Sequence, residues 1–456
     1  MATLLVRHAL LVATMDDERR EIPDCDVLID GQAVAQVGPN LQVEADEVID
    51  ARGCVVLPGL VNTHNHLYQT LYRVMPRTEQ ATFDTWITYL SRLWLERPFS
   101  PEAVYAAALV AFGEMLLTGC TTSADQHYVF PPGQPPDFVD RAIDAAREIG
   151  IRFHPARGCL SLGRSRGGQV PDELVQTEDE ILRHAEQLIA RHHDPRPFAM
   201  VRLVLAPTGI HSDTEAIYRE MRVLASGHPG VQCHTHLYEF VDEAFSLQRY
   251  GLRPLDFMER VGWLGEDVLF YHVVNPNPDE VRRLAASGSV VSHSIAPDLR
   301  MGFGLSPIRE LLDAGARVCL GTTGPAANDG VNLLSDMRLC LLTHRLRSRD
   351  PARWLSAREI LWLATRGGAL GLGRHELGAI APGMGADLAI YDVERIDMAG
   401  HHDPLAALLF MGASHFTRAT VVNGQVVARS GQLLRIDQEQ ATRAANRWAR
   451  QLASTT

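Results

Sequence analysis

Short apolar runs alternate with helix-like segments through the middle of the chain. Eight runs rich in Val, Ile and Leu have the length of buried strands, and most are separated by segments with helix start and stop signals. Pro101 stands where a helix start favours proline, and Gly150 and Gly288 stand where helix ends favour glycine. The eight predicted strands cover residues 55–63, 120–125, 152–157, 201–207, 231–237, 268–274, 289–295 and 317–323.

This alternation predicts an α/β fold in which parallel strands are joined by right-handed helical crossovers. A doubly wound open sheet is the alternative, but polar residues gather at the predicted strand ends, which favours a closed (β/α)₈ TIM-type barrel. The 456 residues are enough for such a barrel, which takes about 250 residues, and a smaller accessory domain. We expect the barrel to span residues 59–381.

The two ends of the chain share a different pattern, in which short Val, Leu and Ile runs are broken by tight-turn signals. Asn423-Gly424, between two apolar runs, predicts a β-hairpin. We therefore expect residues 1–58 and 382–435 to build one small composite β-sandwich domain from both termini. Residues 436–456, with Ala, Arg and Gln at helical spacing, predict a closing helix.

Composition narrows the function classes. Acidic residues outnumber basic ones by 55 to 43, the net charge is −12, and no basic stripe occurs, which argues against a nucleic-acid partner. No apolar run approaches the roughly 20 residues that a membrane span needs. The seven cysteines form no CxxC pair and sit mostly in apolar runs, so we predict buried free thiols. With an N-terminus that lacks signal-peptide features, this predicts a cytoplasmic protein.

Side chains that can bind a metal gather at the predicted carboxyl ends of the strands, where barrel active sites lie. His64 and His66 end the first strand, and because they are two residues apart, their rings leave the same face. Two imidazoles side by side suit zinc and other borderline divalent metals. The first strand therefore predicts one half of a metal site.

Further histidines end the fifth and sixth strands. The fifth strand ends in His234-Thr235-His236, either of whose histidines could be a ligand, and the sixth ends in His272. We select His236 because it lies closer to the strand end and to Glu239, which leaves His234 one layer deeper. Glu239, beside the predicted metal, is placed to move protons.

Other candidates have weaker signals. Gln126 and His127, at the end of the second strand, are predicted to contact substrate or to cap a loop. Asn328 is predicted to contact substrate by hydrogen-bonding a ring substituent. Trp86 lies on a predicted lid after the first strand, where core packing explains it almost as well.

The order of these motifs resembles the amidohydrolase superfamily. The resemblance is carried by residues 57–66, by the His-Thr-His-Leu-Tyr-Glu segment at 234–239, by His272, and by residues 124–127, 295–301, 321–324 and 328–330. Within the superfamily, the chain resembles the branch of s-triazine hydrolases (atrazine chlorohydrolases) and cytosine and guanine deaminases. It is similar, more loosely, to 8-oxoguanine and pterin deaminases. The likeness runs nearly end to end.

The resemblance implies roles for individual residues. Phe303 stands where the resembling hydrolase has a larger aromatic residue, so it is expected to contact substrate and to change the width of the pocket. Glu239 becomes the acid/base, and four histidines become the metal ligands, namely His64, His66, His236 and His272. Most of the superfamily has an aspartate after the eighth strand, where this chain has Thr323, a departure that the resembling s-triazine hydrolase shares. We therefore predict that Thr323 is a catalytic residue, although its hydroxyl cannot act as a base near neutral pH. Glu239 would then carry both proton transfers.

These features predict an enzyme with one Zn²⁺ per chain, Fe²⁺ being the alternative metal. Zinc lowers the pKa of a bound water to about 7, which makes hydroxide available to attack an electron-poor ring carbon. The expected reaction displaces chloride, a thioether, an alkoxy or an amino group from a small s-triazine-like N-heterocycle. The alternative is an aminohydrolase (deaminase) of a purine, pterin or pyrimidine such as guanine or 8-oxoguanine. A metal-free scaffold is a third hypothesis, and the resemblance implies a homodimer.

Overall fold

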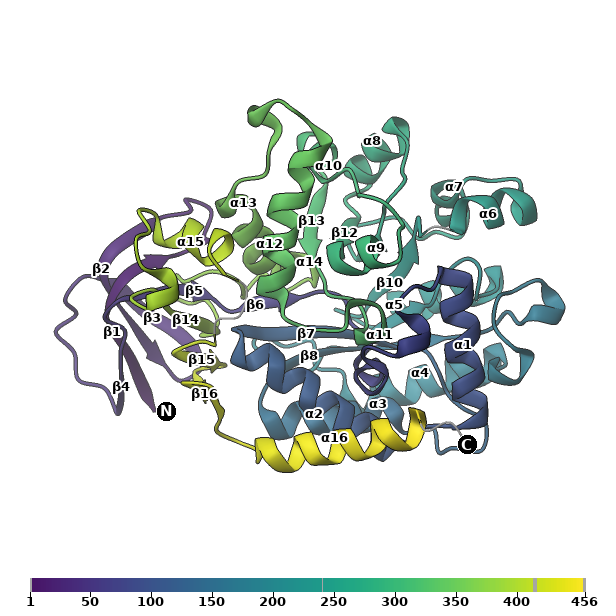
Figure 1. Cartoon of the computed structure of the whole chain (residues 1–456), viewed down its shortest axis with the longest axis horizontal. Coiled ribbons are helices and arrows are strands. Elements are labelled where there is room, and N and C mark those ends of the chain that lie inside the picture. Colours follow the sequence, from purple (N-terminus) through teal and green to yellow (C-terminus); the bar gives the residue numbers. More distant parts are fainter. Residues whose placement is uncertain (1, 240, 413–415, 454–456) are drawn as a thin grey trace.

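The computed structural model describes residues 2–239, 241–412 and 416–453. Within these residues, nine strands form one mixed sheet to which both ends of the chain contribute (Figure 1). β5, from the N-terminal part of the chain, pairs in antiparallel fashion with β14, from the C-terminal part, as expected for a domain built from both ends. The nine strands are β1 (Thr3–Ala13), β2 (Glu21–Asp30), β3 (Ala33–Gly38), β4 (Glu47–Asp50), β5 (Cys54–Pro58), β14 (Leu388–Asp392), β15 (Ala419–Val422), β16 (Gln425–Arg429) and β17 (Gln432–Leu433).

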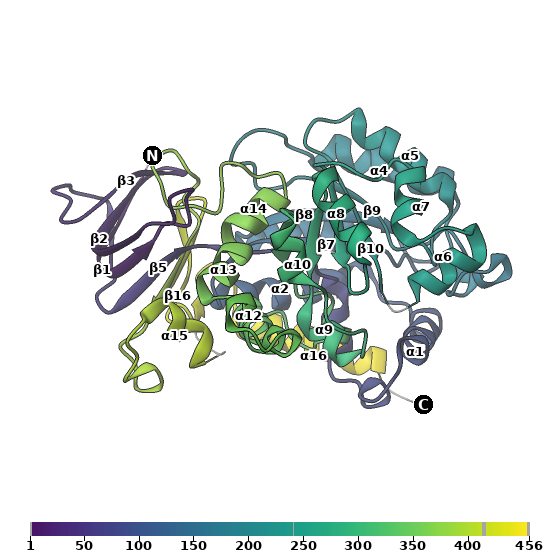
Figure 2. The same cartoon turned by 90° about the horizontal axis from the view of Figure 1, so that it is seen from above.

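The small sheet has an apolar core of its own, separate from that of the rest of the molecule. The β-sandwich expected from the sequence is instead a single sheet. An isolated bridge between Ala33 and Gly385 connects its β3 edge to the segment before β14. The predicted hairpin is confirmed: Asn423 and Gly424 connect β15 to β16 with φ of 52° and 78°. Figure 2 shows this sheet at one end of the molecule, beside the barrel.

Eight parallel strands form the second sheet of the described residues, and each pairs with its neighbour in chain order. Its two edges meet, because Thr63 N donates to Leu320 O at 3.1 Å and Thr323 N donates to His64 O at 2.9 Å. The predicted (β/α)₈ barrel is therefore confirmed. Its strands are β6 (Leu60–Asn62), β7 (Cys120–His127), β8 (Arg152–Cys159), β9 (Val204–Pro207), β10 (Gln232–Leu237), β11 (Val268–His272), β12 (Val290–His293) and β13 (Arg317–Leu320).

The first predicted strand, 55–63, is divided between the two sheets. Its first part is β5 in the small sheet and its last part is β6 in the barrel. Gly59 is the point of division, and its N–H donates to Asp387 O at 2.8 Å. A Cβ at Gly59 would lie 2.1 Å from Thr121 Oγ1, so the close approach of the two sheets requires glycine here.

Helices cover the outside of the barrel, and their ends follow the sequence signals. Ser100 accepts a hydrogen bond from Ala103 N ahead of α2, and Gly150 and Gly288 adopt left-handed backbone after α3 and α8. The principal helices are α1 (Phe83–Glu96), α2 (Pro101–Leu117), α3 (Phe138–Ile149), α4 (Glu178–His192), α5 (Glu215–Ser226), α6 (Asp242–Tyr250), α7 (Pro254–Arg260), α8 (Pro278–Ser287), α9 (Ile295–Arg300), α10 (Ile308–Asp313), α11 (Pro325–Asn328), α12 (Leu333–Thr343), α13 (Ala357–Trp362), α14 (Gly368–Gly371) and α15 (Pro404–Phe410).

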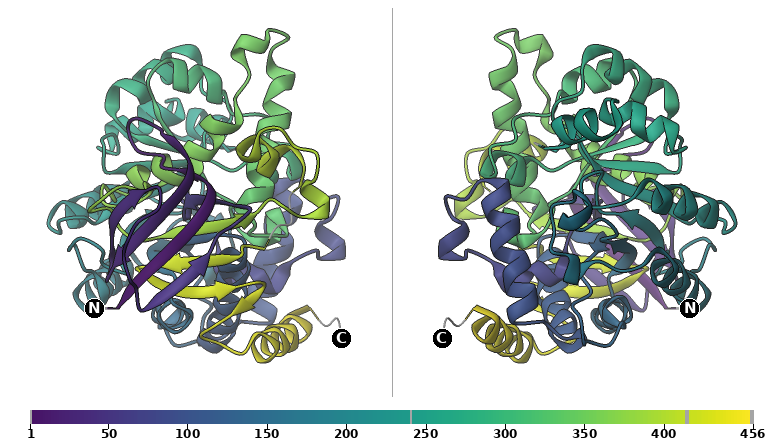
Figure 3. Two further views of the ribbon diagram at one scale, coloured as in Figure 1. Left: turned by 90° about the vertical axis from the view of Figure 1, so that its left-hand side faces the viewer. Right: turned by 90° about the vertical axis from the view of Figure 1, so that its right-hand side faces the viewer.

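The last helix, α16 (Gln438–Ala453), packs along α2 at the base of the molecule (Figure 3). All seven cysteines are buried free thiols, as predicted. Of the helices in the described residues, none combines the length and apolar character that crossing a membrane would need.

Candidate metal centre

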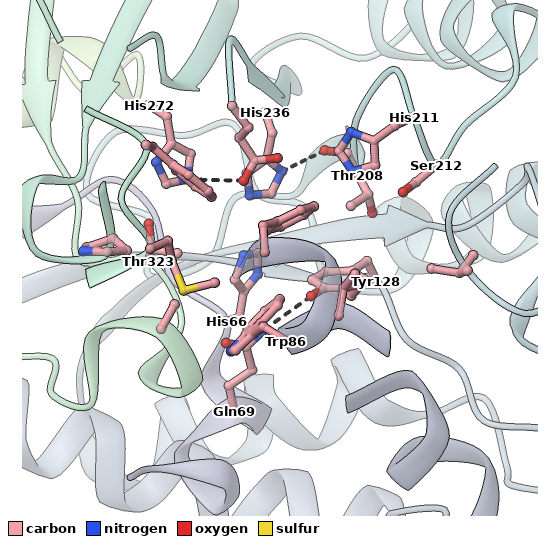
Figure 4. A pocket seen from close by; sticks show the side chains of 18 of the residues that line it. His66, Gln69, Trp86, Tyr128, Thr208, His211, Ser212, His236, His272 and Thr323 are labelled. Atoms are coloured by element: carbon pink, nitrogen blue, oxygen red, sulfur yellow. Dashed lines mark hydrogen bonds and ion pairs between the residues drawn. The ribbon is translucent and has the colours of Figure 1, made fainter. Parts of the chain in front are cut away.

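Four histidine rings meet at the carboxyl end of the barrel strands. His64 and His66 follow β6, His236 lies on β10 and His272 ends β11. The ring centroid of His64 lies 4.8 Å from that of His66, 4.9 Å from that of His236 and 5.7 Å from that of His272. Figure 4 shows His66, His236 and His272 directed into one shared space. The period-two spacing of the strand residues thus brings the predicted rings together.

Hydrogen bonds from the main chain orient two of these rings. His66 Nδ1 lies 2.8 Å from the carbonyl oxygen of Gln126, and His236 Nδ1 lies 2.6 Å from that of Thr208. A carbonyl can only accept, so each Nδ1 carries the proton and donates it. Each Nε2 is left with a lone pair, as a metal ligand requires.

His272 is oriented by a carboxylate in place of a carbonyl. Its Nδ1 lies 2.6 Å from Asp298 Oδ1, and Asp298 is completely buried at the start of α9. His272 Nε2 has no hydrogen-bond partner among the described residues. A carboxylate at Nδ1 makes the imidazole a stronger electron donor at Nε2.

Replacing Asp298 by asparagine is expected to weaken zinc binding by about 10–100-fold, the usual effect of losing such a partner. The amide removes the negative charge and can present a donor to His272 Nδ1, which favours the wrong tautomer. Competition with a chelator measures the affinity. Asp279→Asn, an exposed carboxylate in the first turn of α8, is the control, and an unchanged affinity in Asp298→Asn would contradict the orienting role.

Burial keeps three of the four rings neutral, whereas at His272 the carboxylates of Asp298 and Glu239 outweigh burial and raise the pKa. The effect of burial is large at the other three. It lowers the pKa of His66 to about 3 and holds the pKa values of His64 and His236 well below the usual range. His64 is fully buried against Tyr271, with ring centroids 3.5 Å apart, and neither of its nitrogens has a partner within the described part of the chain. Buried, neutral, unpartnered imidazoles suit a divalent cation, and an all-imidazole set suits zinc.

Glu239 stands beside these rings, just beyond β10. Its Oε1 lies 3.8 Å from His272 Nε2, and its N–H donates to Asp242 Oδ2 at 3.1 Å, which fixes the backbone. Burial raises the pKa of Glu239 to about 7, against the opposing effect of His272. A carboxyl group with such a pKa can both accept and donate a proton near neutral pH.

Unusual backbone conformations occur at two of the strand ends that form the site. His272, Val273 and Thr323 have φ of 70°, 52° and 57°, in the left-handed region that non-glycine residues rarely adopt. Such residues cost about 1–3 kcal/mol each and are found where function requires them. At Thr323 this backbone holds the side chain at the cavity, where its Oγ1 has no partner among the described residues.

A largely apolar cavity opens over the rings of His66, His236 and His272, and it is also lined by Trp86, Phe303, Thr323 and Glu239. Trp86 is anchored because its Nε1 donates to the carbonyl oxygen of Ala326 at 3.0 Å. Its neighbour Phe83 lies between it and Phe303, with ring centroids 6.0 and 5.7 Å away. These rings form an apolar wall that suits a small aromatic heterocycle.

Three other predicted substrate residues do not line the cavity. The Gln126 amide donates to two main-chain carbonyls of β9, at 3.1 Å each. His127 stacks on Phe138 at a centroid distance of 5.2 Å. Asn328 turns back and donates to Asp336 Oδ2 at 2.8 Å, because the short α11 points it away from the rings. These three side chains support the barrel wall.

The buried carboxyl group of Asp336 makes the stability of the folded protein depend on pH. Burial raises the pKa of Asp336 to about 8, well above its value of about 4 in an unfolded chain. The folded state therefore holds this proton where the unfolded state has lost it, so stability falls as pH rises from about 4 to about 8. We expect Asp336→Asn to flatten this decline and to raise the midpoint of urea unfolding at pH 8. An unaltered pH dependence in the variant would contradict this assignment.

The sequence did not single out several polar residues of the cavity, namely Gln69, Tyr128, Thr208, His211 and Ser212. His211 is the most notable, since its Nδ1 lies 2.9 Å from Asp242 Oδ1, on the carboxyl group that also accepts from Glu239 N. His211 lies four residues beyond the end of β9. Active-site residues of barrels gather at the carboxyl ends of the strands and in the loops that follow, so its position is a signal of the same kind as the positions of His64 and His272.

Comparison with known proteins agrees with this geometry. The model of the amidohydrolase family matches residues 55–427. Over 402 residues the chain is 40% identical to 8-oxoguanine deaminase of Pseudomonas aeruginosa, covering 87% of each chain. Over 459 residues it is 35% identical to hydroxydechloroatrazine ethylaminohydrolase of Pseudomonas sp. (strain ADP), covering 98% of this chain and 95% of the relative.

Among solved structures, the chain is similar to atrazine chlorohydrolase from Arthrobacter aurescens TC1 complexed with zinc. The TM-score is 0.95 at 40% sequence identity, and the match covers 98% of this chain and 100% of the other. The family match spans most of the chain, and the shared architecture includes both the barrel and the small sheet. The protein is therefore an enzyme of the amidohydrolase family.

Proposed function

We propose that this chain is a zinc-dependent hydrolase that displaces chloride, a thioether, an alkoxy or an amino group from an s-triazine-like N-heterocycle. The proposal rests on the side chains that meet at the carboxyl end of the barrel, which we call the donor set. Four imidazoles converge beside one carboxyl group, Glu239, while the eighth strand is followed by the hydroxyl of Thr323. Resemblance links a threonine at this place to s-triazine hydrolases.

The zinc ligands in this proposal are the ring nitrogens of four residues: His64, His66, His236 and His272. When bound, zinc supplies a nucleophile at neutral pH by lowering the pKa of a water ligand toward about 7. The zinc complex of the similar chlorohydrolase supports this choice of metal.

The chain's own residues provide binding and proton transfer. The apolar wall around Trp86 and Phe303 binds the flat ring and excludes water from its faces. Glu239 takes the proton of the attacking water and delivers it to a ring nitrogen or to the leaving group. Chloride leaves without a proton, whereas an amine needs one, so Glu239 matters most for amines.

A second candidate function is deamination of a purine or pterin. The polar side chains of Thr208, His211 and Ser212 favour it, because they reach the cavity and could bind the carbonyl groups of such bases. The similarity to 8-oxoguanine deaminase points the same way. The two functions differ in substrate and share the metal centre.

A substrate panel tests the proposal. The zinc-loaded enzyme is assayed with chloro-, methylthio- and amino-substituted s-triazines and with guanine, 8-oxoguanine and pterins, and the released chloride, thiol or ammonia is measured. We expect the highest kcat/KM for a triazine. Turnover confined to purines or pterins would replace the first function by the second.

Thr323→Asp is expected to raise amine release relative to chloride release by roughly 10²-fold, the lower end of the usual range for a positioned acid or base. The new carboxylate would take the proton of water and leave Glu239 free to protonate the amine. Aspartate also tolerates the left-handed backbone of this position. The ratio of kcat/KM values measures the effect, with Thr323→Asn as the uncharged control. An unchanged ratio would show that Thr323 does not select the leaving group.

We also propose a cytoplasmic homodimer. Seven buried free thiols support a reducing compartment, since disulfides form and persist in oxidising ones. Sedimentation velocity tests the dimer, and a single species at the monomer mass of 50.3 kDa would reject it.

A further inference from the structure

A second group of buried side chains that can bind metal lies away from the candidate metal centre. His293 ends β12, Cys340 lies on α12, and His344 lies where α12 continues into the 3-10 turn His344–Arg347. One ligand atom from each of the three lies within 4.8 Å of the other two. The residues are 1%, 0% and 6% exposed, and none of them lines the cavity at the candidate metal centre.

The fold places these side chains together for simple reasons. Cys340 and His344 are four residues apart, so they share one face of the helix. That helix packs against α9, on the β12 side of the barrel (Figure 1), which brings its face to His293. Two ligands at this spacing on a helix and a third from a strand form a compact donor set.

Hydrogen bonding within the cluster accounts for the two histidine rings but not for the thiol of Cys340. His293 Nε2 and His344 Nε2 are 3.0 Å apart, with ring centroids separated by 5.0 Å. Burial lowers the pKa of His344 to about 3, so this ring is neutral and has a lone pair. A single shared proton would satisfy the two rings. The Cys340 thiol is fully buried, and no hydrogen bond to it is found in the described residues.

We propose that His293 Nε2, His344 Nε2 and Cys340 Sγ bind a second Zn²⁺. Two imidazole nitrogens and a thiolate sulfur are typical zinc donors, and a water can complete the tetrahedron. On binding, the thiol proton goes to solvent and a Zn–S bond takes the place of the S–H bond. The proton shared by the two Nε2 atoms moves to Nδ1 of the ring that carries it, so both Nε2 lone pairs are free and one proton is released net for each ion bound. The site needs no redox partner.

Such an ion would also support the candidate metal centre. His293 Nδ1 lies 3.5 Å from Asp298 Oδ2, and the other oxygen of Asp298 holds His272. Fixing His293 on a metal therefore limits the movement of Asp298. The proposal stands on this cluster alone and does not rest on the reaction assigned to the enzyme.

Cobalt substitution tests the proposal, since Co²⁺ bound to a thiolate gives a near-ultraviolet charge-transfer band that a histidine site cannot give. The metal-depleted full-length protein is titrated with Co²⁺ alone. We expect two equivalents per chain and the thiolate band in the wild type. Cys340→Ser should lose the band and one equivalent. His66→Ala should keep the band while losing the other equivalent, so the two sites are separated.

The matched control is Cys120→Ser, another buried thiol, which should keep both the band and the two equivalents. Where Cys340→Ser does not fold, His344→Gln serves in its place and should reduce the band and the second equivalent. The proposal is overturned if the wild type shows no thiolate band, if the band persists in a folded Cys340→Ser variant, or if the band is undiminished in a folded His344→Gln variant.

Discussion

Replacing His66 by alanine is expected to abolish zinc binding at the candidate metal centre and, with it, turnover. His66 is held with Nε2 toward the other rings by the Gln126 carbonyl, and alanine leaves three imidazoles around a cation. The loss should exceed the roughly 10–100-fold effect of removing a partner that only orients a ligand. Metal content after gel filtration and kcat measured on the same sample are the two readouts.

His234→Gln is the matched control, because His234 is equally buried but both of its ring nitrogens are engaged in hydrogen bonds, to Tyr271 and Gln232. It should retain the metal. Full zinc content and activity in His66→Ala would contradict the assignment of His66 as a metal ligand. Loss of both in a folded His234→Gln variant would contradict the exclusion of His234.

Glu239→Gln is expected to lower kcat by roughly 10²–10⁴-fold, the range for a positioned proton-transfer group. The amide keeps the shape of the side chain but cannot take a proton from water and pass it on. Zinc content should be unchanged, since the four rings are untouched. The reduction should be larger for an amino than for a chloro leaving group, because only the amine must leave with a proton.

The control for Glu239 is Glu243→Gln on α6, a carboxylate that pairs with Arg253 at the surface. It should behave as the wild type. Near-full activity of Glu239→Gln with every leaving group would contradict the proton-transfer role and would leave the donor set without its acid/base.

Much of the fold and of the four-histidine cluster could be predicted because both follow from local periodicity. The pattern of apolar runs located all eight barrel strands, and the two-residue spacing of His64 and His66 fixed which face their rings share. The division of the first strand at Gly59 was not visible, because residues 55–63 form one continuous apolar run that two sheets share.

Contacts between distant segments could not be predicted. Asp298 orients His272 from another element, and the side chain of Gln126 crosses to the carbonyls of β9 and so does not line the cavity. Asn328 is turned away by a helix too short to show periodicity. Each depends on how neighbouring strands and loops are aligned, which no single stretch of sequence encodes.

We infer that four imidazoles bind one zinc ion with Glu239 beside it. Crystals grown in excess zinc, with diffraction data collected on both sides of the zinc absorption edge, test it most directly. We expect an anomalous peak at about 2.0–2.1 Å from a nitrogen of each ring. An intact barrel without such a peak among His64, His66, His236 and His272 would contradict it.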